Sequence, residues 1–438
     1  MIKNLYFLFA VSFSSAAFSQ GNVKEKFSNY LDSLNAHHKV MGSFAFANND
    51  QPTFIKVTGF ADAEKQQKAN MNTQYRIGSI SKTFTAVLVM KAVEDKKLSL
   101  KTKLSDFFPE IVNANQITIE NLLQHRSGIH NITDEAEYLN YYTKPQTQDQ
   151  LLSYLKKYAS DFLPGSKYSY SNSNYILLGL ILEKVYKQSY ADLIKNKISK
   201  PLKLSLTEVG GKIDSDKNQA ESYQFLGIYQ PLPETDMSVP IGAGSVISTP
   251  SDLLKFIIGL ENGKLINKNS LTQMKNFVDD YGYGLIKANV GQYHGFGHEG
   301  AIDGFHSAIY YFPESKIAVS FITNQSSGDD QDILTKMMNA ASGKDFEMPG
   351  FKEISVSESI LKKYEGNYKA PGFPLDIKIF VENGMLNGQA TGQGAFPLKA
   401  ISETEFTFET AGIKTKFDAD KKTMQFSQGA NNITFTKQ

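Results

Sequence analysis

The sequence predicts an α+β fold: an antiparallel sheet flanked by helices, followed by a small all-β barrel-like domain. Two observations lead to this prediction. Up to about residue 346, strand-like segments lie near both ends and enclose a helical middle. Beyond residue 350 the apolar side chains alternate with period two, which is typical of half-buried strands. The length of the chain also favours more than one domain.

Helix and strand signals follow one another along the first part of the chain. Residues 23–39 show the helical spacing of apolar side chains, and residues 42–60 resemble a hairpin. Residues 249–252, Thr-Pro-Ser-Asp, place a capping hydroxyl, a proline and a carboxylate at the start of a helix. Residues 334–341 predict a closing helix. Strands at the two ends around helices fit one antiparallel sheet covered by those helices.

The last part of the chain predicts a separate module at residues 351–438, after a boundary near residues 347–350. Ile377, Ile379 and Val381 alternate and lead into Asn-Gly at residues 383–384, a strong hairpin signal. Similar alternations recur between turns up to the end of the chain, which favours about eight short strands in a barrel. The module contains no catalytic constellation, so we expect it either to cap or shape the mouth of an active site or to bind a ligand.

The most informative motif is Ser79-Ile80-Ser81-Lys82. A hydroxyl and an amine three residues apart share one face of a helix, so Lys82 can reach the Ser79 oxygen. The apolar run after Lys82 predicts a buried helix, and burial lowers the pKa of a lysine towards neutrality. Ser79 and Lys82 are therefore candidates for a nucleophile and its base.

Two further segments add the remaining groups that acyl transfer requires. Tyr170-Ser171-Asn172 follows a Pro-Gly turn and precedes an apolar stretch, which indicates a loop running into a buried helix. In an extended segment, Tyr170 and Asn172 point the same way. His298-Glu299-Gly300 lies in a glycine-rich segment before an aromatic strand-like run. Acyl transfer needs a nucleophile, a base, a proton donor and donors to the oxyanion, and the three motifs contain all four.

On these motifs the sequence resembles the serine β-lactamases and penicillin-binding-protein hydrolases, in particular the class C β-lactamase-like branch with its D-peptidases and esterases. Their Ser-x-x-Lys, Tyr-x-Asn and Lys/His-x-Gly motifs occur in the same chain order. The resemblance covers residues 25–345 and includes the segments 122–129 and 242–252. It implies an α/β sandwich with an added all-helical subdomain, and we expect this serine hydrolase domain at residues 20–346.

The resemblance also implies roles for the first two motifs. Ser79 would be the acylated nucleophile. Either Lys82, as a neutral amine, or Tyr170, as a phenolate beside that lysine, would take its proton, and the sequence leaves both as candidates. Asn172 would hydrogen-bond Lys82 and the amide of a substrate.

The third motif departs from typical β-lactamases, which carry a lysine where this chain has His298. The resemblance implies that His298 faces Ser79 from an edge strand, that Gly300 and Ala301 contact the substrate, and that the N–H groups of Ser79 and Ala301 form the oxyanion hole. Because a free histidine has a pKa near 6.5, we expect an ionisation of His298 between roughly pH 5.5 and 7.5. Glu299 should repel a substrate carboxylate unless it points away along the strand, which disfavours β-lactams.

Other chemistries are disfavoured. His294 and His298 form an H-x-x-x-H pair, but the glycines around them oppose the helix that such a zinc pair needs, and the chain has no cysteine. We therefore expect no metal and no cofactor. A Ser-His-Asp hydrolase requires a Gly-x-Ser-x-Gly elbow, which the sequence lacks. His125 is expected to be a structural residue before a turn, and Asp303-Gly304 to be a turn.

The first 19 residues predict a cleaved signal peptide. Lys3 supplies a positive charge, residues 5–13 an apolar core, and Ala17 and Ser19 the small residues that a signal peptidase recognises. The apolar stretch is too short to span a bilayer. Without cysteine the chain can carry no lipobox anchor. We therefore expect a periplasmic or secreted protein without a membrane span.

Charge and composition narrow the partners. The chain has 46 basic and 45 acidic residues and no long basic run, so nucleic acid and anionic membranes are poor candidates. Its 30 phenylalanines and 22 tyrosines suffice for substantial cores without tryptophan. We expect a small-molecule or peptide acyl substrate, with fragments of peptidoglycan among the candidates. The sequence does not determine the oligomeric state.

Three functions are compatible with the sequence. The first is an exported serine hydrolase that cleaves an amide or ester through an acyl-enzyme on Ser79, with D-amino-acid peptidase, carboxypeptidase-like or esterase-like activity. The second is a β-lactamase, which His298 and Glu299 disfavour. The third is a non-catalytic binder of cell-wall peptides, which the intact motifs disfavour.

Overall fold

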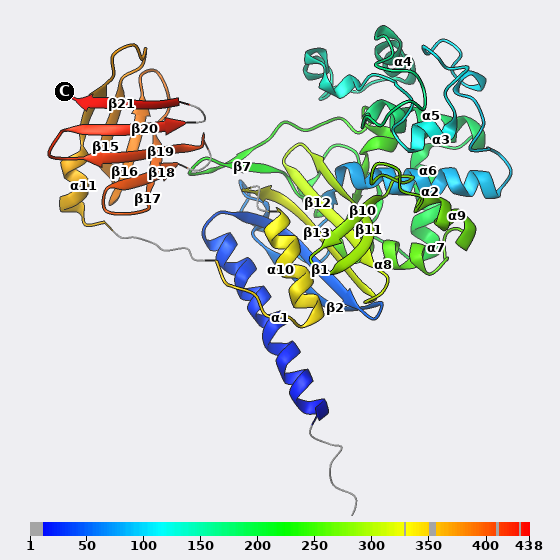
Figure 1. The fold of residues 1–438 in the computed structure, drawn as a ribbon, viewed down its shortest axis with the longest axis horizontal. Coiled ribbons are helices and arrows are strands. Elements are labelled where there is room, and N and C mark those ends of the chain that lie inside the picture. The colour runs from blue at the N-terminus through cyan, green and yellow to red at the C-terminus, as the bar shows by residue number, and fades with distance from the viewer. Residues whose placement is uncertain (1–11, 328–329, 350–355, 409–410, 429–430) are drawn as a thin grey trace, which may run out of the picture. The chain divides into compact units, whose positions relative to one another are not determined.

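The computed structural model describes residues 12–327, 330–349, 356–408, 411–428 and 431–438 (Figure 1). The chain forms two units. Residues up to 224 and residues 231–347 make the first, and residues 225–230 and 348–438 make the second. Each unit has its own hydrophobic core.

Six antiparallel strands form the central sheet of the first unit, in the order β10-β11-β12-β13-β1-β2. Their bounds are β1 Val40–Asn48, β2 Gln51–Thr58, β10 Ile286–Val290, β11 Tyr293–Ile302, β12 Phe305–Phe312 and β13 Ile317–Ser326. β1 pairs with β13, so the two ends of this unit meet in the middle of the sheet. The predicted antiparallel sheet and the hairpin of residues 42–60 are confirmed.

Of the helices of the first unit, α1, α10 and α8 lie against this sheet, and others, such as α4, lie away from it in a helical region (Figure 1). The bounds of the helices are α1 Ser12–Ala36, α2 Ser81–Glu94, α3 Ile119–Leu123, α4 Gln148–Lys157, α5 Asn172–Tyr186, α6 Tyr190–Ile194, α7 Lys200–Leu202, α8 Pro250–Glu261, α9 Lys268–Met274 and α10 Asp330–Ser342. The segments that connect these elements contain short strands: β3 Phe60–Asp62, β4 Gln67–Lys68, β5 Tyr75–Arg76, β6 Glu208–Val209, β7 Tyr223–Phe225, β8 Tyr229–Pro231 and β9 Val246–Ser248. Short segments of 3₁₀-helix contribute to the site: η1 Gly78–Ile80, η3 Ile132–Asp134, η4 Ala136–Asn140 and η7 Ile241–Ala243.

Side chains alternate along each strand, so each face of the sheet packs against its own set of helices. Phe46 of β1 lies against Phe27 of α1, with 6.3 Å between the ring centroids. Its neighbours Ala45 and Ala47 point the other way and join the core that contains α8. α1 ends at Ala36, earlier than predicted, and His38 takes a left-handed φ of 54° before β1 begins.

The predicted helix start at residues 249–252 is confirmed in α8, and the predicted closing helix of residues 334–341 lies within α10, which begins earlier, at Asp330. Thr249 caps α8, since its side-chain oxygen accepts a hydrogen bond from the Asp252 N–H at 3.2 Å, and Pro250 stands in the first turn. Among the described residues, no helix is long and apolar enough to cross a membrane.

α2 is buried along most of its length, as the apolar run after Lys82 predicts. Its Phe84 stacks on Phe256 of α8 with 3.8 Å between the ring centroids. A helix that is apolar on every side can be stable only inside the protein. The polar side chains in the first turns of α2 are therefore withdrawn from water, including Lys82.

The second unit is a closed barrel of β14–β21, which confirms the predicted all-β module of about eight strands. Its elements are α11 Glu358–Tyr364, β14 Gly366–Lys369, β15 Ile377–Glu382, β16 Met385–Ala390, β17 Phe396–Ala400, β18 Glu405–Phe408, β19 Ile413–Asp418, β20 Thr423–Gln428 and β21 Asn431–Lys437. Asn383 and Gly384 both have positive φ, 52° and 75°, as an Asn-Gly hairpin turn requires.

Candidate active site

Ser79 lies in η1, directly before α2, where η1 touches strand β11. Two glycines permit this approach. A Cβ on Gly78, which has a φ of 47°, would lie 2.8 Å from the Ala301 oxygen, and a Cβ on Gly300 would lie 2.1 Å from the Ile77 oxygen. Only glycine fits at such distances. The backbone of Ser79 is thereby brought next to Ala301.

Lys82 is fully buried beside Ser79. Its Nζ lies 2.8 Å from the Ser79 Oγ, 2.7 Å from the Asn172 Oδ1 and 3.0 Å from the Ala243 carbonyl oxygen. Burial lowers the pKa of Lys82 well below its usual range. A neutral amine has two N–H donors and one lone pair, which suit two acceptor oxygens and the Ser79 hydroxyl.

Asn172 begins α5 and is held from its other side. Its backbone N–H donates to the Asn131 Oδ1 at 2.9 Å, and its Nδ2 donates to the Thr133 Oγ1 at 2.9 Å. These contacts orient the Asn172 Oδ1 towards Lys82. Asn131 and Thr133 are site residues that sequence reasoning missed, since they are ordinary polar residues in a loop about 40 positions upstream.

Tyr170 lies above Lys82, whose Nζ is 4.9 Å from the centre of its ring. Burial raises the pKa of Tyr170, and a hydrogen bond with Ser79 offsets this only in part. A raised tyrosine pKa opposes the phenolate, whereas the lowered pKa of Lys82 favours the free amine. Of the two candidate bases, the electrostatics favour Lys82.

His125 holds the backbone on both sides of Tyr170. Its carbonyl oxygen accepts from the Ser169 N–H at 2.9 Å, and its Nδ1 accepts from the Ser171 N–H at 3.1 Å. Its ring packs on the Tyr170 ring with 4.3 Å between centroids. Burial, then the charge of Lys82, holds the pKa of His125 well below its usual range, so Nδ1 stays an acceptor.

His125 was expected to be structural, and the structure adds that it positions Tyr170. It does so with a φ of 55°, a left-handed conformation that non-glycine residues rarely adopt.

His298 differs from the sequence expectation in two ways. It does not lie on an edge strand, because β10 lies outside β11. However, β10 pairs only with residues 293–297 of β11, so no residue of β10 is paired with His298. Burial, and next the charge of Lys82, lowers the pKa of His298 to about 3. The expected ionisation between pH 5.5 and 7.5 is therefore wrong, because the sequence does not reveal how deeply this side chain is buried.

Hydrogen bonds fix the neutral tautomer of His298. Nδ1 lies 2.5 Å from the Glu299 carbonyl oxygen, which can only accept, so Nδ1 carries the proton. Nε2 therefore accepts from the Tyr281 hydroxyl at 3.0 Å. Tyr281 was missed, and no spacing rule connects it to a histidine 17 residues later.

Glu299 is exposed and points along the sheet towards α10. Its Oε1 accepts from the Tyr310 hydroxyl at 2.7 Å and from the Gln331 Nε2 at 3.1 Å. It nevertheless lines the same pocket as Ser79, Tyr170 and His298. Its charge therefore faces the space into which a substrate would extend from Ser79.

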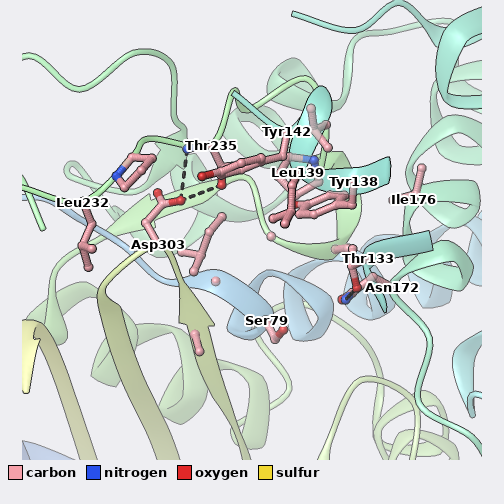
Figure 2. A pocket seen from close by; sticks show the side chains of 18 residues that line it. Ser79, Thr133, Tyr138, Leu139, Tyr142, Asn172, Ile176, Leu232, Thr235 and Asp303 are labelled. Carbon is pink, nitrogen blue, oxygen red and sulfur yellow. Dashed lines mark hydrogen bonds between the residues drawn. The ribbon is translucent and has the colours of Figure 1, made fainter. Parts of the chain in front are cut away.

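Asp303 is in the predicted turn between β11 and β12, with a φ of 54°, and it also forms a buried ion pair. Its carboxylate accepts from Arg76 at 2.7 Å. It also accepts from the Thr235 hydroxyl at 2.6 Å (Figure 2). Arg76 also pairs with Glu234 at 2.6 Å. Sequence reasoning missed this cluster because its members come from three distant segments.

The predicted site residues thus meet at one place. Ser79, Lys82, Tyr170, Asn172, His298, Gly300 and Ala301 either contact one another or line the two pockets that open at Ser79. Within the described ranges, no group of three or more His, Cys, Asp or Glu side chains is arranged to hold a metal ion.

The first prediction concerns pH. The neutral form of Lys82 should be required for attack by Ser79. The value of kcat/KM should therefore be highest at high pH and fall as the pH drops through the lowered pKa of Lys82. His298→Gln keeps a hydrogen-bond acceptor for Tyr281 and should leave the position of this limb unchanged. A limb that vanishes or shifts by about one unit or more in pH–rate profiles of His298→Gln would make the histidine the titrating group.

The second prediction concerns His125. His125→Phe keeps a ring against Tyr170 but cannot accept from Ser171, and kcat/KM should fall about 10- to 100-fold. His125→Asn retains an acceptor and tolerates positive φ, so it should recover most of the activity. Ser160→Ala is the stability control, because its hydroxyl holds Gly128 and Phe162 in the same region without touching Tyr170. Activity that simply follows the melting temperature across these variants would contradict a positioning role.

Comparison with known proteins agrees with this geometry. The family model described as Beta-lactamase matches residues 27–342. The teichoic acid D-alanine hydrolase of Staphylococcus aureus is 28% identical over 254 residues, which is 56% of this chain and 62% of that protein. The chain therefore spans somewhat under two thirds of the length of this curated relative.

Solved structures show the same fold. The D-stereospecific amidohydrolase from Streptomyces sp. is 26% identical, with a TM-score of 0.62 over 72% of this chain and 97% of that chain. The D-amino acid amidase from Ochrobactrum anthropi SV3, complexed with L-phenylalanine, is 24% identical, with a TM-score of 0.66 over 73% and 98%. Since the family model spans well over half of the sequence and all three motifs lie inside the match, the chain belongs to the β-lactamase family.

Proposed function

We propose that this protein is a serine hydrolase that cleaves an amide or ester bond through an acyl-enzyme on Ser79. One observation carries the proposal. The buried amine of Lys82 lies 2.8 Å from the Ser79 Oγ, and burial lowers its pKa. A lysine in this state can take the serine proton at the moment of attack.

The geometry supports a defined sequence of proton transfers. Ser79 attacks the substrate carbonyl while Lys82 accepts its proton. The N–H groups of Ser79 and Ala301 stabilise the oxyanion. Tyr170, which burial keeps protonated, gives a proton to the leaving atom and recovers one from the Lys82 ammonium. Water then attacks the acyl-enzyme: Lys82 accepts a proton from the water and returns it to the Ser79 oxygen as the acyl product leaves.

The relatives favour D-amino-acid derivatives as substrates. Two are named for D-stereospecific or D-amino-acid amide hydrolysis and one for removing D-alanine from teichoic acid. We extend this class to the present chain: a D-peptidase-like or esterase-like hydrolase, for which fragments of peptidoglycan are candidate substrates. Export to the periplasm or medium rests on the sequence signals in residues 1–19, of which residues 1–11 lie outside the described residues.

Charge in the pocket disfavours β-lactams and peptides with a free C-terminal carboxylate. The pocket that Tyr170 and His298 line also contains Glu299 and Asp330, and its described wall includes neither lysine nor arginine. Among the described residues that line this pocket, the remaining ionisable side chain is His306, whose Nδ1 lies 2.6 Å from the Asp330 carboxylate. An uncharged leaving group suits this wall better than an anionic one.

The third prediction tests the nucleophile and base. A fluorophosphonate should label the wild-type protein, and Ser79→Ala should abolish the labelling seen by intact-protein mass spectrometry. Lys82→Arg keeps a cation that cannot deprotonate, so turnover should fall by about 100-fold or more. Lys91→Arg lies on the same helix and should retain turnover, because the Lys91 Nζ hydrogen-bonds the distant Leu265 carbonyl instead. Equal labelling of Ser79→Ala would remove the proposal.

The fourth prediction tests Glu299. Glu299→Gln preserves the shape and an acceptor for Tyr310 but removes the charge. It should raise kcat/KM for a D-dipeptide with a free carboxylate by about three- to tenfold relative to the same peptide as its amide. Glu314→Gln removes a charge from the exposed turn after β12 and should leave this ratio unchanged. An identical ratio in all three proteins would show that Glu299 does not act on the leaving group.

A further inference from the structure

Ser79 stands where two pockets meet. Ser79 and Ala301 line both a cavity of about 390 Å³ and a second one of about 460 Å³. Tyr170 and His298 line the second cavity, whereas Asn172 and Thr133 line the first. A carbonyl carbon at the Ser79 Oγ therefore has one substituent directed into each cavity.

The chemistry assigns the two cavities, given the proposed function on which this step rests. The leaving atom must receive a proton, and Tyr170 is the buried hydroxyl that can supply it. The leaving group therefore enters the second cavity. The acyl group, which stays on Ser79 until water releases it, is left in the first cavity beside Asn172.

The walls of the acyl cavity are mainly apolar and aromatic. Figure 2 shows Ser79 on one side of it and Tyr138, Leu139 and Tyr142 on the other, with Leu232 and Ile176 at its flanks. The rings of Tyr138 and Tyr142 stack with 5.4 Å between centroids. Such walls favour apolar groups through removal of their surface from water.

The charged residue of this cavity is already neutralised. Asp303 lines the cavity, but its side chain is only 1% exposed. One carboxylate oxygen accepts from Arg76, and the other accepts from both the N–H and the hydroxyl of Thr235. An acyl group therefore meets tyrosine rings and aliphatic side chains in this cavity, and Asp303 serves to hold the wall in place.

We propose that the acyl group of the preferred substrate carries a bulky apolar side chain, aromatic or branched aliphatic, instead of the methyl group of an alanyl residue. A volume of about 390 Å³ lies in the range of small-molecule sites, and a single methyl group would leave most of the apolar wall without contact. Leu139 is a specificity-determining residue in this proposal, because it lines the cavity from an exposed turn.

The test compares acyl groups on a constant leaving group. The p-nitroanilides of D-alanine and D-phenylalanine form one pair. The p-nitrophenyl esters of acetic acid and phenylacetic acid form the other. The ratio of kcat/KM for the larger to the smaller acyl group should be about tenfold or more in at least one pair. Leu139→Asp should lower that ratio at least about fivefold, since a carboxylate at the wall opposes an apolar side chain.

Leu163→Asp is the matched control. Leu163 and Leu139 are both 68% exposed, and Leu163 lines neither cavity, so this variant should keep the wild-type ratio. A ratio near one in wild type, or a ratio that Leu139→Asp leaves unchanged, overturns the proposal. These outcomes differ from failure of the proposed function, in which none of the four substrates is turned over or turnover persists in Ser79→Ala.

Discussion

The site depends on one constraint: a lysine must be buried next to a serine without becoming charged. The three partners of Lys82 are a hydroxyl, an amide oxygen and a backbone carbonyl, and none of these atoms carries a full charge. Burial of an ammonium among such groups is costly, which lowers the pKa of Lys82 and favours the free amine. The same burial keeps His125 and His298 neutral. The resting site is therefore a cluster of uncharged groups, and charge separates only when the serine attacks.

This constraint explains several features of the surrounding fold. Most of α2 must be buried to carry Lys82 into the interior, and the helix packs on α8 and α5. The polar segments around it must then be held without charges, which is why Asn131, Thr133 and the ring nitrogen of His125 fix Asn172 and the Tyr170 segment. Gly78 and Gly300 allow β11 to approach η1, so that backbone N–H groups can serve at the oxyanion without any cation.

Local sequence patterns predicted the parts of the site that lie close together in the chain. The positions of Ser79 and Lys82 follow from helix periodicity, and the Tyr170–Asn172 pair follows from an extended segment leading into a helix. The alternating β module was equally local, since Asn383-Gly384 defines its hairpin. Burial was harder to judge. In the sequence His298 resembles any histidine that titrates near neutral pH, and only its burial in the fold and its hydrogen bond to Tyr281 reveal that it stays neutral.

Contacts between distant segments could not be predicted either, because they too arise only in the folded chain. Arg76, Glu234 and Asp303 come from three segments, and each alone resembles an ordinary surface residue or a turn. The two hydrogen bonds that His125 accepts from the Tyr170 segment likewise join loops that only the folded chain brings together. A single sequence gives the residue types but not these pairings.

Chemistry and selectivity reside in different parts of the first unit. The proposed proton-transferring groups come from η1, from α2 and from the segment directly before α5, which lie in or beside the core. The walls of the acyl cavity come from η4 and from the segment between β8 and β9, which are irregular and partly exposed. Loops of this kind tolerate substitution far better than packed helices and strands. Changes in η4 can therefore alter which acyl group is accepted while Ser79 and Lys82 keep the geometry that their chemistry requires, so substrate preference must be inferred from these walls and not from the motifs.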